Sequence, residues 1–181
     1  MASVRGRDLV EALAFVRENY GAEGLERVLA ALAPEARSNF AATIRETGWY
    51  PLQALVDYLR TASRVLEAEP AEFCRSEGRF TAQRQRSGFL GPMVASAAIR
   101  MRMAPVTWRM FYDVGRLEVS GDTPETAVGR IHDFPATIES CARFLGIWEG
   151  ILGSADRAVV AEEVRCVRRG DAYCEIHIRH E

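Results

Sequence analysis

The chain has 181 residues, 48% of them hydrophobic, which suits a globular domain with a sizeable core. Its 23 basic and 25 acidic side chains nearly balance, and this argues against a broad nucleic-acid-binding surface. No apolar run is long enough for an export signal or a membrane span, so we expect a cytoplasmic protein without a membrane-spanning segment. In that compartment the four cysteines are expected to be free thiols or metal ligands.

Apolar residues recur at helical spacing through the first 115 residues, and glycines and prolines divide this stretch into helices. The expected helices cover roughly 9–20, 25–33, 34–44, 52–69, 70–87, 93–103 and 106–114. Pro105 separates the last two, because proline removes a helical hydrogen bond. The arginines at 75, 79, 84 and 86 are interpreted as a solvated helix face.

The periodicity changes after Gly115, where apolar and polar residues begin to alternate as in half-buried strands. Leu117 and Val119 mark a first strand, and further strands are expected over 126–132, 158–167 and 172–179. A helix that opens near Pro135 separates the two strand pairs. Its inner face is expected to be Ile138, Cys141, Leu145, Trp148 and Leu152.

This order of elements predicts an α+β fold in a single ligand-binding-type domain over 1–181. A helical half over 1–115 precedes a sheet half over 116–181. The sheet half is expected to be a four-stranded antiparallel sheet, in the order strand-strand-helix-strand-strand, packed on the long helix. Gly170 is expected in the turn of the last hairpin, where glycine can adopt positive φ.

Three cysteines converge in this arrangement. If the last hairpin turns at Gly170, Cys166 lies across from Cys174, with Cβ atoms about 5 Å apart. Cys141 lies on the apolar stripe of the helix that covers the sheet. A buried thiolate cluster requires a compensating cation, and Zn²⁺ is one that proteins bind through cysteine. The alternative, that these cysteines are only small apolar core residues, stays open at this point.

A fourth ligand to such an ion would be an oxygen from the preceding strand. Strand parity places Glu162 on the cysteine face, whereas Glu163 would require a bulge to reach it. Both carboxylates stay open on spacing alone.

The segment Glu163-Val-Arg-Cys166-Val-Arg-Arg-Gly170-Asp171-Ala-Tyr-Cys174-Glu-Ile resembles the C-terminus of the 4-vinyl-reductase domain family. The resemblance covers roughly Arg130 to Arg179. That family includes ligand-sensing domains of aromatic-responsive bacterial activators and a bacteriochlorophyll-pathway protein, and it is related in fold to heme-nitric-oxide-binding domains and to Golgi transport-complex subunits. The resemblance implies a structural zinc ion held by Cys141, Glu163, Cys166 and Cys174, and therefore favours Glu163 over Glu162.

The same relationship raises the question of heme. The heme-nitric-oxide-binding pattern has a proximal histidine on a helix, followed by Tyr-x-Ser-x-Arg. The segment from Tyr112 to Arg116 has valine in place of the serine, and none of His132, His177 and His180 precedes it. We therefore do not expect heme.

An aromatic cluster precedes the first strand of the sheet. Trp108, Phe111 and Tyr112 lie close together beside several methionines, as in a protein core or in the wall of an apolar pocket. These three residues are the candidate ligand-binding residues. No nucleophile elbow, phosphate-binding loop or zinc-protease motif is present in the sequence, so we assign no catalytic residue and do not expect an enzyme.

These patterns favour a small-molecule-binding sensor or regulatory module with a structural zinc site. Two alternatives follow from the resemblance: a dimeric scaffolding or interaction subunit without a ligand, and an accessory factor of tetrapyrrole metabolism. The expected partners are an apolar or aromatic small molecule, a second copy of the chain bound through the N-terminal helices, and a downstream protein that receives the signal.

Overall fold

The computed structural model describes residues 1–87, 97–121, 127–153 and 159–180. The helices are α1 (Gly6–Ala31), α2 (Pro34–Arg37), α3 (Leu52–Val65), α4 (Pro70–Ser87), α5 (Ala97–Phe111) and α6 (Ile138–Leu152). The strands are β1 (Ser3–Arg5), β2 (Trp49–Pro51), β3 (Arg116–Ser120), β4 (Val128–His132), β5 (Val159–Arg165) and β6 (Cys174–His180). The expected breaks at 88 and 91–92 and the expected turn at 122–124 lie outside the described residues.

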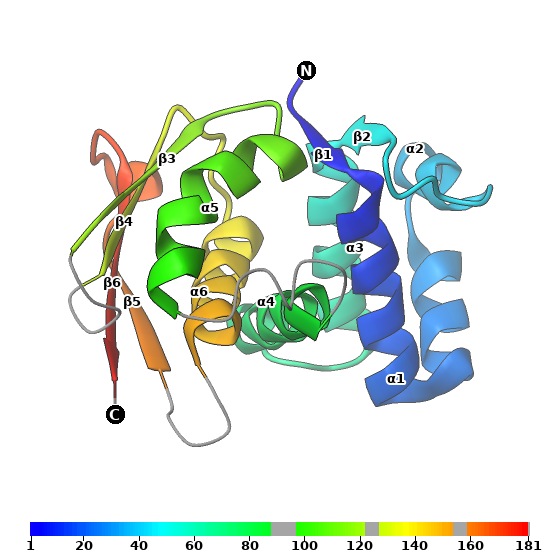
Figure 1. The fold of residues 1–181 in the computed structure, drawn as a ribbon. Helices are drawn as coiled ribbons and strands as arrows, with labels where there is room; N and C mark the ends of the chain where they lie inside the picture. The colour runs from blue at the N-terminus through cyan, green and yellow to red at the C-terminus, as the bar shows by residue number, and fades with distance from the viewer. Residues whose placement is uncertain (88–96, 122–126, 154–158, 181) are drawn as a thin grey trace.

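The expected α+β class is confirmed. Strands β3, β4, β6 and β5 form an antiparallel sheet in that order, and the helical half precedes it in the chain. The sheet lies on one side of α5 and α6, and α1, α2 and α3 lie on the other (Figure 1). No helix of the described residues is both long and apolar enough to cross a membrane.

Helix α6 occupies the middle of the molecule, between the sheet and the helical half. Thr137 caps its N-terminus by accepting a hydrogen bond from the Ser140 backbone N–H, and the Ser140 side chain accepts one in return from Thr137. Because α6 is covered from both sides, it buries much more than one stripe. The expected inner face was wrong at Ile138, whose exposed fraction is 51%.

A two-stranded sheet near the N-terminus was not expected from the sequence. Strand β1 pairs with β2 in antiparallel register, with Val4 opposite Tyr50. Val4 also forms an isolated bridge with Tyr112, directly after α5. This contact holds the N-terminus against the end of α5, and strands of three residues are too short for their alternation to be recognised.

The expected split at Pro105 was wrong, because α5 continues through this proline. The proline costs one backbone hydrogen bond, but Met101, Ala104 and Trp108 bury one side of the continuous helix. The expected stop at Gly21 is present as a kink within α1, where Gly21 has φ 77° and ψ 175°.

Candidate functional site

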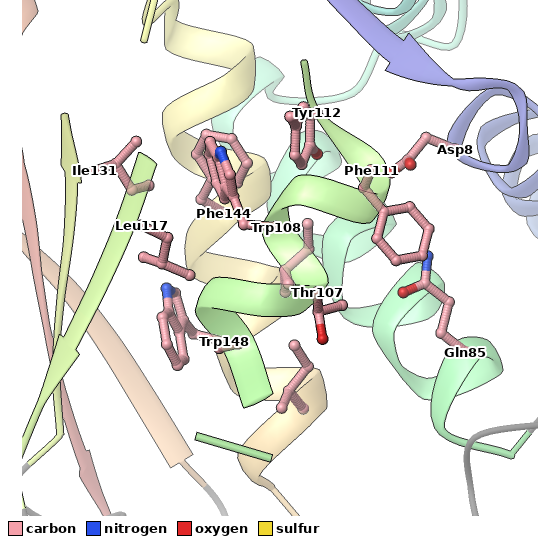
Figure 2. A pocket seen from close by; sticks show the side chains of 13 residues that line it. Asp8, Gln85, Thr107, Trp108, Phe111, Tyr112, Leu117, Ile131, Phe144 and Trp148 are labelled. Atoms are coloured by element: carbon pink, nitrogen blue, oxygen red, sulfur yellow. The ribbon is translucent and has the colours of Figure 1, made fainter. Parts of the chain in front are cut away.

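A cavity of about 90 Å³ lies between α5, α6 and the sheet (Figure 2). Most of its lining is apolar, and it draws on both halves of the chain. The lining residues are Asp8, Gln85, Ala104, Thr107, Trp108, Phe111, Tyr112, Leu117, Ile131, Phe144, Ile147, Trp148 and Ile151.

The aromatic residues of this lining pack against one another. The Trp108 ring centroid lies 4.6 Å from that of Tyr112 and 5.2 Å from that of Phe144. The Trp108 indole N–H donates to the Val114 carbonyl at 3.1 Å, which satisfies its only polar atom. The structure thus places the candidate residues Trp108, Phe111 and Tyr112 in the wall of one cavity, and their role in binding a ligand stays a prediction.

The sequence interpretation missed two other groups of lining residues. Trp148 was expected only on the inner face of the long helix, and Phe144 was not singled out. Asp8 and Gln85 were not singled out either. The available signal for Asp8 was an acidic residue among the apolar positions of the first helix, where it is 2% exposed.

A second, outer cavity of about 420 Å³ adjoins the first. The two share Gln85, Thr107 and Phe111 in their linings, so these side chains stand between them. The outer cavity is more polar and is also lined by Arg5, Arg7, Glu46, Thr47 and Met110.

A buried ionic cluster borders the inner cavity. The Arg143 guanidinium, 2% exposed, donates to Asp8 Oδ1 and to Glu77 Oε2, each at 2.6 Å, and to the Tyr112 hydroxyl at 2.8 Å. Burial raises the pKa of Asp8, and the two carboxylates hold the pKa of Arg143 above its usual value despite burial. The cluster joins α1, α4 and the end of α5 to α6.

Arginines of α4 bind carboxylates of α6 and α1. Arg75 and Arg79 both donate to Glu149, with Arg75 Nε at 3.1 Å and Arg79 Nη1 at 3.2 Å from its oxygens. Arg84 donates to Glu11 at 2.7 Å. The expectation of a solvated arginine face was therefore wrong for Arg75 and Arg79, which are half-buried against the buried Glu149. Arg84 stays exposed, with 46% of its side chain accessible.

The three cysteines expected to converge do so. Cys166 Sγ lies 3.6 Å from Cys141 Sγ and 3.7 Å from Cys174 Sγ. All are buried and free, and these distances exceed the ~2.05 Å of a disulfide. The ligand atoms of the three cysteines and Glu163 all lie within 4.8 Å of one another. Thiolates at ~2.3 Å from a tetrahedral ion would lie ~3.8 Å apart, so the spacing suits a metal ion.

A register shift in β5 lets Glu163 and Cys166 face the same cluster. In β5, Glu163 pairs with Ile176 on the buried face of β6, and the pairing shifts before Arg165. The shift restores Cys166 to the buried face, as the choice of Glu163 required. Glu162 faces away and pairs with Arg179 at 3.1 Å.

The pKa values of the three thiols are shifted in different directions. A hydrogen bond from Cys141 lowers the pKa of Cys174 to about 6, and the same bond raises the pKa of Cys141. Burial raises the pKa of Cys166. Metal binding requires deprotonated thiols, and Cys174 is the one most ready to supply a thiolate.

No family model matches the chain, and no curated protein matches it. Solved structures do match over nearly its full length. An H-NOX protein from S. oneidensis in the Fe(II)NO state has a TM-score of 0.76 at 11% identity, over 98% of this chain and 99% of that one. An oxygen-binding H-NOX domain related to soluble guanylate cyclases has a TM-score of 0.71 at 15% identity, over 98% and 95%. The H-NOX protein mutant A71G from K. algicida gives 0.71 at 10%, over 98% and 96%.

These findings correct the family assignment. The structural neighbours are H-NOX domains rather than 4-vinyl-reductase domains, and no family model supports the latter. The short C-terminal motif matched a cysteine spacing, whereas the comparison of structures covers 98% of the chain. The identification of the metal as zinc rested on that resemblance and loses its support.

The expectation against heme is also contradicted, because the structural neighbours are heme proteins that include an Fe(II) form. Of the usual protein ligands to heme iron, His, Cys, Met and Tyr, only Tyr112 is among the described residues that line the cavity. Its hydroxyl accepts a hydrogen bond from Arg143, and burial raises its pKa and keeps it neutral. The described lining does not fit a heme iron bound by a protein ligand. The chain shares the fold of the H-NOX domains.

Proposed function

We propose that this chain is a small-molecule sensor domain of the H-NOX fold, in which a small apolar or aromatic ligand occupies the inner cavity. The observation that carries the proposal is the partly open cavity of about 90 Å³ with aromatic and aliphatic walls between α5, α6 and the sheet. Apolar cavities of ~150 Å³ bind benzene, whereas drug-sized ligands need ~300–1,000 Å³. The inner cavity is smaller than either and is partly open, so a ligand of one ring would fill it and extend toward Gln85, Thr107 and Phe111, which also line the outer cavity.

Helix α5 links the inner cavity to an exposed apolar surface. Trp108 and Phe111 contact the cavity from α5, and the opposite face of α5 exposes Ile99, Met103, Val106 and Met110. Spacings of four, three and four residues place these side chains on one face of the helix. A ligand that moves α5 would therefore alter an exposed apolar face, which supports a downstream protein partner there.

The expected homodimer through the N-terminal helices also stays a proposal. Static light scattering at high micromolar concentration tests it, and a monomer would contradict it. Of the exposed large hydrophobic side chains in the described N-terminal helices, Tyr20 of α1 is 40% exposed, which is less than each of the four on α5. The larger exposed fractions of these four side chains favour α5 over the N-terminal helices as a protein contact.

Binding of toluene to the purified full chain tests the cavity. We expect a rise in melting temperature and a change in tryptophan fluorescence, because Trp108 and Trp148 line the cavity. Ala104→Leu should abolish both responses by filling the space. Ala98→Leu is the matched control, because Ala98 is an exposed residue of the same helix.

Two results would oppose the cavity proposal. Equal toluene responses in Ala104→Leu and in the unmodified chain would show that toluene binds outside the inner cavity. Stoichiometric uptake of hemin with a defined Soret band would show that the chain binds heme rather than a small apolar ligand. Each titration is therefore run with hemin in parallel.

We also propose that Cys141, Glu163, Cys166 and Cys174 hold a thiolate-preferring metal ion that fastens α6 to the β5–β6 hairpin. Soft sulfur ligands favour first-row transition metals over Mg²⁺ or Ca²⁺. Four protein ligands leave no open position, so the site would be structural. The support is the mutual distance of the four ligand atoms and the register shift after Glu163, which lets Cys166 share the buried face with Glu163.

Elemental analysis of protein purified without chelator tests this site. We expect about one equivalent of a single transition metal, lost in Cys141→Ser and retained in Cys74→Ser. Cys74 is the matched control, because it is buried in α4 and is not part of the cluster. A metal content below about a tenth of an equivalent would mean that the cysteines are core residues only.

A further inference from the structure

Asp8 lines the inner cavity and has one carboxylate oxygen without a hydrogen-bond partner among the described residues. Its side chain is 3% exposed, it lines the cavity, and it extends from α1 toward α5 in Figure 2. Oδ1 accepts the hydrogen bond from Arg143, but Oδ2 is buried and has no hydrogen-bond partner among the described residues. A buried oxygen of a carboxylate without a partner is costly, so this atom favours a ligand that donates to it.

The charges around Asp8 favour a cationic donor. The buried cluster contains one guanidinium, that of Arg143, against the carboxylates of Asp8 and Glu77, which leaves an excess of one negative charge when both are ionised. Glu11 approaches Asp8 as well, but Arg84 binds it at 2.7 Å. Burial of an uncompensated carboxylate is unfavourable, and a cation beside Oδ2 would balance the charge.

We propose that Asp8 is the polar anchor of the cavity and that its Oδ2 accepts a hydrogen bond from the ammonium group of a small arylalkylamine. This inference rests on the proposed function, because it assumes that the inner cavity binds a ligand. The aromatic ring lies against the apolar lining, and the nitrogen lies at the Asp8 end. An anionic ligand of the same size is excluded, because its carboxylate would meet that of Asp8.

A series of ligands with one ring and different head groups tests the anchor on the full chain. Benzylamine carries an ammonium donor, benzyl alcohol a neutral donor, toluene no donor and benzoate an anion. By isothermal titration calorimetry, we expect benzylamine to bind about ten- to a hundredfold more tightly than toluene, with benzyl alcohol between them. Benzoate should not bind.

Asp8→Asn tests the same contact from the protein side. The substitution keeps the shape of the side chain and removes the excess charge, while Arg143 keeps Glu77 and Tyr112 as partners. We expect the preference for benzylamine over toluene to fall to about threefold or less. Asp57→Asn is the matched control, because Asp57 lies on α3 outside the cavity lining, and it should leave the preference unchanged.

The outcomes separate this inference from the function on which it rests. If toluene and benzylamine compete for the unmodified chain and bind it with equal affinity, the proposed role of Asp8 is overturned. The cavity proposal then stays intact. Binding of no member of the series would overturn both. The unmodified chain alone decides between these results if Asp8→Asn does not fold.

Discussion

Replacing Gly146 with alanine would place a methyl group inside the contact between α4 and α6. A Cβ built on Gly146 lies 1.8 Å from the Arg75 carbonyl oxygen and 2.9 Å from the Arg79 nitrogen, both backbone atoms of α4. The contact is reciprocal, because a Cβ on Gly78 of α4 would lie 2.1 Å from the Arg143 carbonyl oxygen of α6. The two helices therefore approach closely enough to exclude a side chain at either glycine.

The loss of stability can be worked out from how far the two helices must move apart to accommodate the methyl group. Cβ atoms essentially never lie under 3.0 Å from another heavy atom, so the helices must part by at least about 1.2 Å, the difference from 1.8 Å. Such a movement would stretch the 2.6 Å contact between Arg143 and Glu77 beyond hydrogen-bonding distance. Alanine gains ~1 kcal/mol of helix propensity over glycine. The clash with the backbone and the weakened ion pair exceed this, and we expect a net loss of about 3 kcal/mol.

Urea unfolding followed by far-UV circular dichroism measures this loss. Gly170→Ala is the control, because Gly170 has φ 93° with nothing within 4 Å of its built Cβ among the described residues. That variant tests backbone strain alone, at a cost of about 1–2 kcal/mol. A free energy of unfolding for Gly146→Ala within about 1 kcal/mol of the unmodified chain would refute the close packing of α4 and α6.

Two further expectations concern the cavity. Burial raises the folded-state pKa of Asp8 above its unfolded value, so the folded chain binds more protons between the two pKa values and loses stability as pH rises through the folded pKa. Asp8→Asn should therefore gain stability relative to the unmodified chain as pH rises above the ordinary aspartate range, and parallel stability curves would contradict this. In β4, a Cβ on Gly129 would lie 2.8 Å from Trp148 Cζ2, so Gly129→Ala should displace that ring and weaken toluene binding in fluorescence titrations. Unchanged toluene affinity would show that Trp148 does not shape the cavity.

The sheet half was predictable because its signals are local. Alternation in the last strand placed Cys174, Ile176 and Ile178 on the buried face, and the structure buries all three. Gly170 adopts φ 93° after the short 3₁₀ turn Val167–Arg169, as a hairpin glycine can. Convergence of three cysteines followed from these two features and the stripe of one helix.

The ionic cluster was not predictable, because its members are distant in sequence. Asp8 and Arg143 are separated by 135 positions, and each occurs in a helix whose charged residues would ordinarily face solvent. Burial of Arg143 became evident only once α6 was seen to be covered from both sides. The continuity of α5 through Pro105 depends in the same way on tertiary packing, which outweighs the local cost of proline.

Both proposed sites share α6, and this geometry predicts that they are coupled. Cys141 contacts the β5–β6 hairpin, whereas Arg143, two residues later, contacts Asp8, and Phe144 of the next position lines the cavity. Loss of the metal would release one end of α6 from the sheet, so chelator-treated protein should bind toluene at least about fivefold more weakly, the lower end of typical coupling between sites. Linkage requires that saturating toluene strengthen metal binding by the same factor, which a competition titration against a metal-indicator dye measures. Circular dichroism confirms that the chelated chain stays folded. Identical toluene affinities with and without metal would mean that α6 holds two independent sites, and that the cysteine cluster has no part in sensing.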